Sequence, residues 1–143
     1  MTRESRTLAG TLLVVLPTVM FGGVTLLRFL VTREAGYMDN PLRQDLWRAG
    51  HAHAGVYLVL ALVMLRYVDE ADLSAAWKRF ARVSAPSAAI LVPAAFFLSV
   101  VSPRSTEPNA LINLAYLGAI VLAAGVVTLG VGLLRAAKKE RAG

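Results

Sequence analysis

Cysteine is absent from the whole chain of 143 residues. Without a thiol, the protein forms no disulfide, iron–sulfur cluster or thiolate metal site of its own. This absence also excludes the four-helix membrane oxidoreductases that work through pairs of cysteines. Imidazole is the strongest remaining metal ligand, and the chain has only two histidines.

Acidic residues are absent from the four long apolar runs at residues 7–31, 50–65, 83–101 and 111–134. Ionisable groups inside a membrane usually mark proton relays and substrate paths. The lack of carboxylates therefore argues against a proton-coupled transporter. It also excludes the small four-helix multidrug exporters, which need an intramembrane glutamate. Transport of a small solute by another route stays open.

Hydrophobic residues make up 57% of the chain, above the roughly 45–50% of ordinary globular domains. A helix needs ~20 residues to cross the hydrocarbon core. The apolar runs therefore predict an all-α fold, an integral membrane four-helix bundle in a single domain over residues 1–143. Between the second and third runs, Leu73, Trp77 and Phe80 follow a helical spacing that predicts an amphipathic helix on the membrane surface. The predicted segments are helices at about 7–31, 41–67, 84–101 and 108–135, and a cytoplasmic amphipathic connector at 69–84.

The net charge of +6 comes from basic residues that gather on one side of the predicted membrane. Cytoplasmic loops carry an excess of lysine and arginine. Both termini are therefore predicted to be cytoplasmic, in a multi-pass protein of the plasma or inner membrane. The same distribution explains the basicity without nucleic acid as a partner. The basic residues on the side of the termini are Arg3, Arg6, Arg66, Lys78, Arg79, Arg82, Arg135, Lys138, Lys139 and Arg141.

The fourth predicted helix carries rows of small residues, which let helix backbones approach closely in lipid. These rows either pack the helix into its own bundle or form a contact with another subunit. The second alternative predicts a homo-oligomer or a subunit of a larger membrane complex. The rows are Ala115, Ala119 and Ala123; Ala124, Thr128 and Gly132; and Gly118, Gly125 and Gly132.

Polar side chains from several predicted helices fall at one depth, near the extracytoplasmic face. The inner half of the predicted bundle is almost purely aliphatic. Polar groups are costly in a bilayer, so such a cluster is a hypothesis for a functional site. The candidate cofactor-binding residues are Arg28, Arg48, His51, His53, Tyr57, Asn109, Asn113 and Tyr116.

His51 and His53 are the candidate metal or cofactor ligands. Positions two apart on a regular helix point about 200° from each other. Three arrangements are open. In the first, His51 faces the bundle beside Arg48 and His53 faces a neighbouring subunit or the headgroups; the second is the reverse. In the third, the helix is distorted around Gly50 and both rings reach one metal.

Imidazole suits haem iron, copper and zinc. For a haem, Arg28 or Arg48 would hold a propionate, while Gly50 and Gly55 would leave room for the macrocycle. A quinone is a further possibility, because its carbonyls accept hydrogen bonds from His, Tyr, Arg or Asn. The simplest alternative is that both histidines are interfacial, satisfied by a carbonyl, water or lipid phosphate.

The stretch "RAGHAHAGVYLVLALVM" at 48–64 carries a local resemblance. It resembles the histidine-bearing helix of small uncharacterised membrane proteins that are similar to a fragment of haem–copper oxidase subunit I. In those oxidases such a helix provides an axial haem ligand, and the resemblance assigns that role to His51 or His53. The chain has no further histidine for a second haem ligand or for a three-histidine copper centre. Oxygen reduction and proton pumping by this chain alone are therefore excluded.

These patterns predict a binding or redox-accessory membrane protein, with haem or copper as candidate cofactors. The first alternative is a non-catalytic scaffolding or assembly subunit of a larger complex. The second is a protein that binds a quinone or lipid, or that carries a small solute. No nucleophile or carboxylate pair points to an enzyme, although a histidine could act as a base.

Overall fold

The computed structural model describes residues 1–142, which form helices and no strand. The helices are α1 (Arg3–Val31), α2 (Pro41–Tyr67), α3 (Ala75–Ser99) and α4 (Asn113–Glu140), with a 3₁₀ turn, η1 (Ala110–Ile112), before α4. All four are long and apolar enough to cross a membrane. The predicted all-α fold with four membrane-spanning candidates is confirmed.

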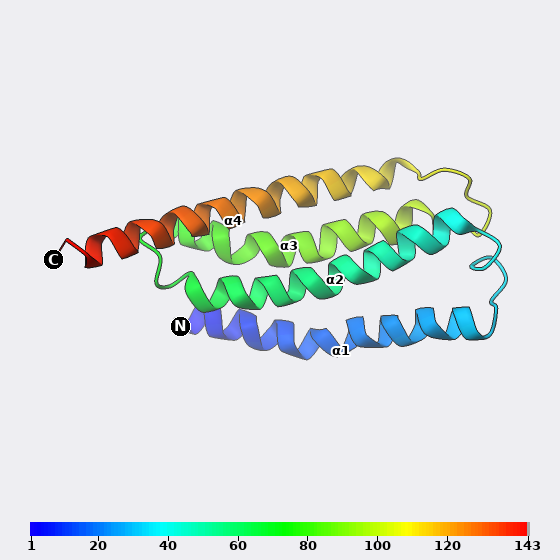
Figure 1. Ribbon diagram of the computed structural model, residues 1–143, viewed down its shortest axis with the longest axis horizontal. Coiled ribbons are helices and arrows are strands. Elements are labelled where there is room, and N and C mark those ends of the chain that lie inside the picture. The colour runs from blue at the N-terminus through cyan, green and yellow to red at the C-terminus, as the bar shows by residue number, and fades with distance from the viewer. Residues whose placement is uncertain (143) are drawn as a thin grey trace.

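The helices run side by side in chain order, with both termini at the same end of the molecule (Figure 1). α1 packs on α2, α2 on α3 and α3 on α4, and α2 also touches α4. The link between α2 and α3 lies at the end that holds the termini, and the other two links lie at the opposite end. Successive helices are therefore antiparallel.

Polar caps extend two helices beyond the apolar runs that predict them. α2 begins at Pro41 as predicted, and the side chain of Asn40 caps it. α1 begins at Arg3 rather than residue 7, because Thr2 accepts a hydrogen bond from the Ser5 amide. Ser74 caps α3, which therefore starts nine positions before the predicted residue 84. Residues 75–84 of the predicted connector thus form the first part of α3, and residues 69–74 form the link before it.

Glycines spaced seven apart on α4 bring it against its own bundle. A Cβ on Gly118 would lie 2.6 Å from Val92 Cγ2, and one on Gly132 would lie 2.5 Å from Leu73 Cγ. A Cβ on Gly125 would overlap the side chain of Ser84. The glycine row therefore packs on α3 and on the link before it. A contact between subunits through α4 stays a prediction. The row of alanines on α4 is more exposed than the glycine row and remains available for such a contact.

Much of the surface of α1 is apolar and exposed. Its buried side chains are Ser5, Leu12 and Leu26. An apolar helix surface of this extent is stable when lipid covers it, which agrees with a multi-pass membrane protein. Its large exposed hydrophobic residues are Leu13, Val14, Val15, Met20, Phe21, Val24, Leu27, Leu30 and Val31.

Aromatic side chains close the end opposite the termini. Tyr37 is 1% exposed, and its ring lies 5.5 Å from that of Phe29 and 6.1 Å from that of Trp47. The Arg43 guanidinium stands 4.0 Å from the centre of a Trp47 ring and donates to the carbonyls of Gly36 and Val101. The cluster joins the α1–α2 loop and the start of α2 to the end of α3, which restricts sliding of α2 along its own axis.

A buried ion cluster holds the end with the termini. Arg82, 7% exposed, donates from Nε to Ser5 Oγ (2.9 Å), and its Nη2 lies 2.7 Å from Asp69 Oδ1. Its Nη1 pairs with Glu4 at 3.1 Å. The Thr2 amide donates to the second oxygen of Asp69 at 2.6 Å. One arginine thus ties the start of α1 to the α2–α3 link, so it is a packing residue as well as a member of the basic side.

Acid is expected to weaken this cluster. Burial alone would raise the pKa of Asp69, but hydrogen bonds from Arg82, Thr2 and Ser5 lower that pKa from 3.8 to about 2. A carboxylate with a depressed folded-state pKa stabilises the fold above its unfolded value and loses that contribution as the pH falls through the folded value. Thermal unfolding of detergent-solubilised protein from about pH 5 to about pH 2 should reveal a loss of about 2 kcal/mol. Asp69→Asn should remove this pH dependence, and an equal slope in that variant would contradict the assignment.

Candidate functional site

The two histidines of α2 face different neighbours. His53 points toward α3 and α4, where its ring lies 5.3 Å from the Phe96 ring. His51 points toward α1, where a Cβ added to Gly23 would lie 2.8 Å from His51 Nε2. Helix α2 continues unbroken through Gly50, so the two rings keep the separation of a regular helix. The arrangement in which a distorted helix brings both rings to one metal is therefore wrong.

The His53 ring is held in one orientation by its own helix. Its Nδ1 lies 2.7 Å from the carbonyl oxygen of Ala49. A carbonyl only accepts hydrogen bonds, so Nδ1 carries a proton, and in the tautomer with that single proton the lone pair lies on Nε2. Edge-to-face packing against Tyr57 and Phe96, both at 5.3 Å, restricts the ring further. His53 thus offers a fixed acceptor, or a ligand nitrogen, to whatever approaches Nε2.

His53 lines a pocket of about 260 Å³ between α2, α3 and the start of α4. Small side chains on α4, Ala115 and Ala119, leave the space that a larger residue would fill. Tyr116 stands at its edge with 67% of its surface exposed. The pocket is therefore an aromatic and aliphatic hollow with a few hydrogen-bonding groups. Its lining residues are His53, Tyr57, Val92, Phe96, Ile112, Ala115, Tyr116 and Ala119.

His51 lines a separate hollow of about 420 Å³ on the opposite face of α2, with Ala52, Gly55, Val56 and Val59. All of these residues belong to α2 itself, so the hollow lacks a second polar wall. Gly23 of α1 is needed here, because a Cβ on it would lie 2.8 Å from His51 Nε2, whereas one on Gly22 would make an ordinary contact at 3.7 Å. We therefore read His51 mainly as a packing residue between α1 and α2.

Of the predicted site residues, the structure brings together His53, Tyr57 and Tyr116. Arg28 and Arg48 are exposed, and Arg48 donates to Gln44 at 2.9 Å. Asn109 caps η1 through the Leu111 amide and donates to the Leu98 carbonyl, and Asn113 donates to the Ala110 carbonyl. Neither arginine nor asparagine lines the pocket, so the site is less polar than the sequence predicts.

Other parts of the predicted cofactor site are filled by packing. Gly50 does not leave room for a macrocycle, because a Cβ there would lie 3.0 Å from a ring carbon of Phe97. Phe96, Val92 and Ile112 form walls that the sequence did not single out. Apolar residues inside an apolar run carry no signal of their own, so only the packing of α3 and α4 identifies them.

The residues 1–142 contain no group of three or more His, Cys, Asp or Glu side chains that could hold a metal ion. A zinc or copper ion usually needs three or four protein ligands. The pocket therefore suits a ligand that needs one imidazole rather than a metal ion held by this chain alone. No known family model matches the chain, and neither the curated proteins nor the solved structures give a match.

Proposed function

We propose that this protein is a membrane-embedded binding protein whose ligand is a lipid-soluble aromatic molecule with hydrogen-bonding oxygens, the chemistry of a quinone or quinol. The observation that carries the proposal is the fixed His53 ring, whose Nδ1 is engaged by Ala49 while Nε2 stays free beside an aromatic-walled pocket. The distribution of basic residues supports cytoplasmic termini, which places this pocket near the extracytoplasmic face.

The chemistry of the pocket matches both oxidation states of such a ligand. A quinol hydroxyl donates to the free Nε2 of His53, and a quinone carbonyl accepts from a tyrosine hydroxyl, since Tyr57 and Tyr116 both line the pocket. The Phe96 ring and the alanines of α4 provide an apolar surface for the ring system. The exposure of Tyr116 and Ala119 supports entry from the bilayer rather than from water.

Haem is the second candidate, favoured by the hydrogen bond of His53. Histidines that ligate iron usually donate their other ring nitrogen to a carbonyl or carboxylate, and His53 does so through Nδ1. His53 would then be an axial ligand. However, the pocket has no lysine or arginine in its lining to pair with propionates. Haem therefore fits this pocket less well than a neutral ligand.

The histidines provide a matched pair of variants for testing this function. Protein purified gently from its native membrane should release a quinone on solvent extraction, identified by mass spectrometry. His53→Ala should reduce the bound amount at least about tenfold, because it removes the acceptor and the ring contacts. His51→Ala should retain the ligand, because its ring lies on the other face of α2.

Spectra of the same samples, oxidised and reduced, distinguish the candidates. A Soret band that is present in the wild type and absent in His53→Ala would identify the ligand as haem rather than a quinone. Equal ligand content in wild type, His53→Ala and His51→Ala would contradict the assignment of the site. If no ligand is extracted from the wild type, titration with a short-chain quinone tests the same contrast between the two variants.

A further inference from the structure

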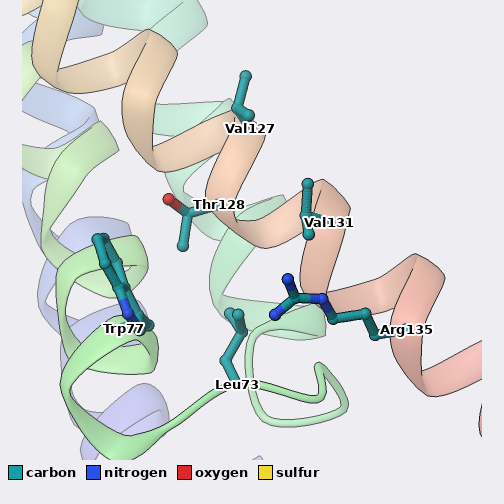
Figure 2. A pocket seen from close by; sticks show the side chains of 6 residues that line it. All are labelled: Leu73, Trp77, Val127, Thr128, Val131 and Arg135. Carbon is teal, nitrogen blue, oxygen red and sulfur yellow. The ribbon is translucent and has the colours of Figure 1, made fainter.

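A pocket of about 310 Å³ lies at the opposite end of the bundle from His53. It is formed where the start of α3 and the second half of α4 meet the α2–α3 link. Figure 2 shows the Arg135 side chain turning back from α4 toward Leu73, with Trp77 on the far side of the same space. None of the residues assigned to the His53 site lines this pocket. Its lining residues are Leu73, Trp77, Val127, Thr128, Val131 and Arg135.

The pocket combines an apolar wall with one charged group at its end. Val127, Val131 and Arg135 follow one another at four-residue spacing, so they form a line along one face of α4. Val127 is 65% exposed, and the Trp77 ring opposite is 55% exposed. An apolar chain lying along this line would meet a guanidinium as it leaves the hydrocarbon region. Tryptophan is enriched at that depth of the bilayer.

Arg135 makes no direct ion pair within the part of the chain that the structure describes, although its charge acts on Asp72 from a distance. Its neighbour Lys139 is paired with Asp72 at 2.7 Å, whereas Arg135 is in no ion pair among residues 1–142. The hydrogen bond and charge of Lys139 lower the pKa of Asp72 most, with smaller contributions from the charges of Arg135 and Lys78, so Lys139 is the direct partner of that carboxylate. An anionic group approaching Arg135 therefore need not displace an existing partner.

We propose that this pocket binds one acidic phospholipid, with its phosphate on Arg135 and an acyl chain along Val127 and Val131. Arginine pairs with phosphate oxygens in a bidentate geometry. The surrounding end of the molecule is basic, with Lys138 and Arg141 following on α4, and this favours an acidic over a zwitterionic lipid. A free phosphate would use only the guanidinium and leave the apolar wall bare. The inference rests on membrane insertion and not on the His53 site.

Trp77 provides a direct reporter, because the chain has only two tryptophans. Trp47→Phe protein is reconstituted into phosphatidylcholine vesicles that contain a small, equal fraction of acyl-brominated lipid, either phosphatidylglycerol or phosphatidylcholine. Bromine quenches a tryptophan that it contacts. Brominated phosphatidylglycerol is expected to quench Trp77 as though it were enriched about fivefold, the effect of one basic residue at an anionic surface.

Variants separate a specific site from the general charge of this surface. Arg135→Gln should abolish the preference for phosphatidylglycerol. Arg141→Gln lowers the net charge by the same amount outside the pocket, and it should keep the preference. Equal quenching by both lipids in the parent, or the same loss in both variants, would overturn the proposal.

Native mass spectrometry with both tryptophans intact tests the proposal even if Trp47→Phe fails to fold. The wild-type protein should retain one phosphatidylglycerol at energies that strip phosphatidylcholine, and Arg135→Gln should not. Excess inorganic phosphate should leave the lipid bound. Displacement of the phosphatidylglycerol by inorganic phosphate would show that the site recognises the phosphate group alone. That result would overturn the proposed occupant.

Discussion

Replacing Gly125 with alanine is expected to destabilise the protein by about 1–3 kcal/mol, the usual cost of forcing a side chain into a packed interior. Gly125 is buried on α4, and a Cβ there would overlap both the Oγ and the Cβ of Ser84 on α3. Ser84 is 0% exposed, so its side chain has no free space to move into. The two helices must therefore separate. Thermal unfolding in a mild detergent measures the loss.

Another glycine of the same helix is the matched control. A Cβ on Gly130 meets nothing within 4 Å, so Gly130→Ala should be neutral or slightly stabilising through helix propensity. Adding Ser84→Gly to Gly125→Ala should recover part of the loss, measured against Ser84→Gly alone. Equal unfolding temperatures for Gly125→Ala and Gly130→Ala would show that α4 does not pack on α3 through this row.

Replacing Arg82 with methionine is expected to cost about 3 kcal/mol, because it removes the charged partner of the partly buried Asp69 carboxylate. The Asp69 side chain is 12% exposed and the Arg82 side chain 8% exposed, so water replaces the lost contact poorly. The start of α1 should loosen at the same time, since Ser5 and Glu4 both bind this guanidinium. Unfolding temperature and hydrogen exchange of residues 3–12 report the two effects.

Two further variants separate the ion pair from the loss of a surface charge. Arg79→Gln removes an exposed charge one turn earlier and should change stability by less than about 0.5 kcal/mol. Combining Arg82→Met with Asp69→Leu removes both charges of the pair and should recover most of the stability. If Arg82→Met is as stable as Arg79→Gln, the cluster does not hold the two segments together.

The sequence predicts the helices well, because the length and hydropathy of a membrane span depend on the chain alone. It misses the polar extensions of α1 and α3, since an apolar run ends where Arg6 or Arg82 appears although the helix continues. Arg82 is counted as one of many surface charges. Its partner Ser5 is 77 positions away, and the pairing is visible only once α1 and α3 are packed.

The candidate site is predicted only in part, because its composition also depends on how the helices pack. Helical periodicity puts His51 and His53 on opposite faces of α2, which the structure confirms. Which neighbour each ring meets depends on how α2 is rotated, and that rotation is set by close contacts such as Gly23 against His51 and Gly50 against Phe97. Polar residues at equal depth do not have to converge. Asn109 and Asn113 serve the start of α4 instead of the pocket.

Photolabelling tests most directly the claim that a lipid-soluble aromatic ligand occupies the His53 pocket. Protein in its native membrane is irradiated with a quinone that carries a photoreactive group, and labelled peptides are mapped by mass spectrometry. We expect label within residues 53–57, 92–96 or 112–119, removed by excess unlabelled quinone and by His53→Ala but not by His51→Ala. Label spread over the exposed face of α1, or unchanged in His53→Ala, would contradict it.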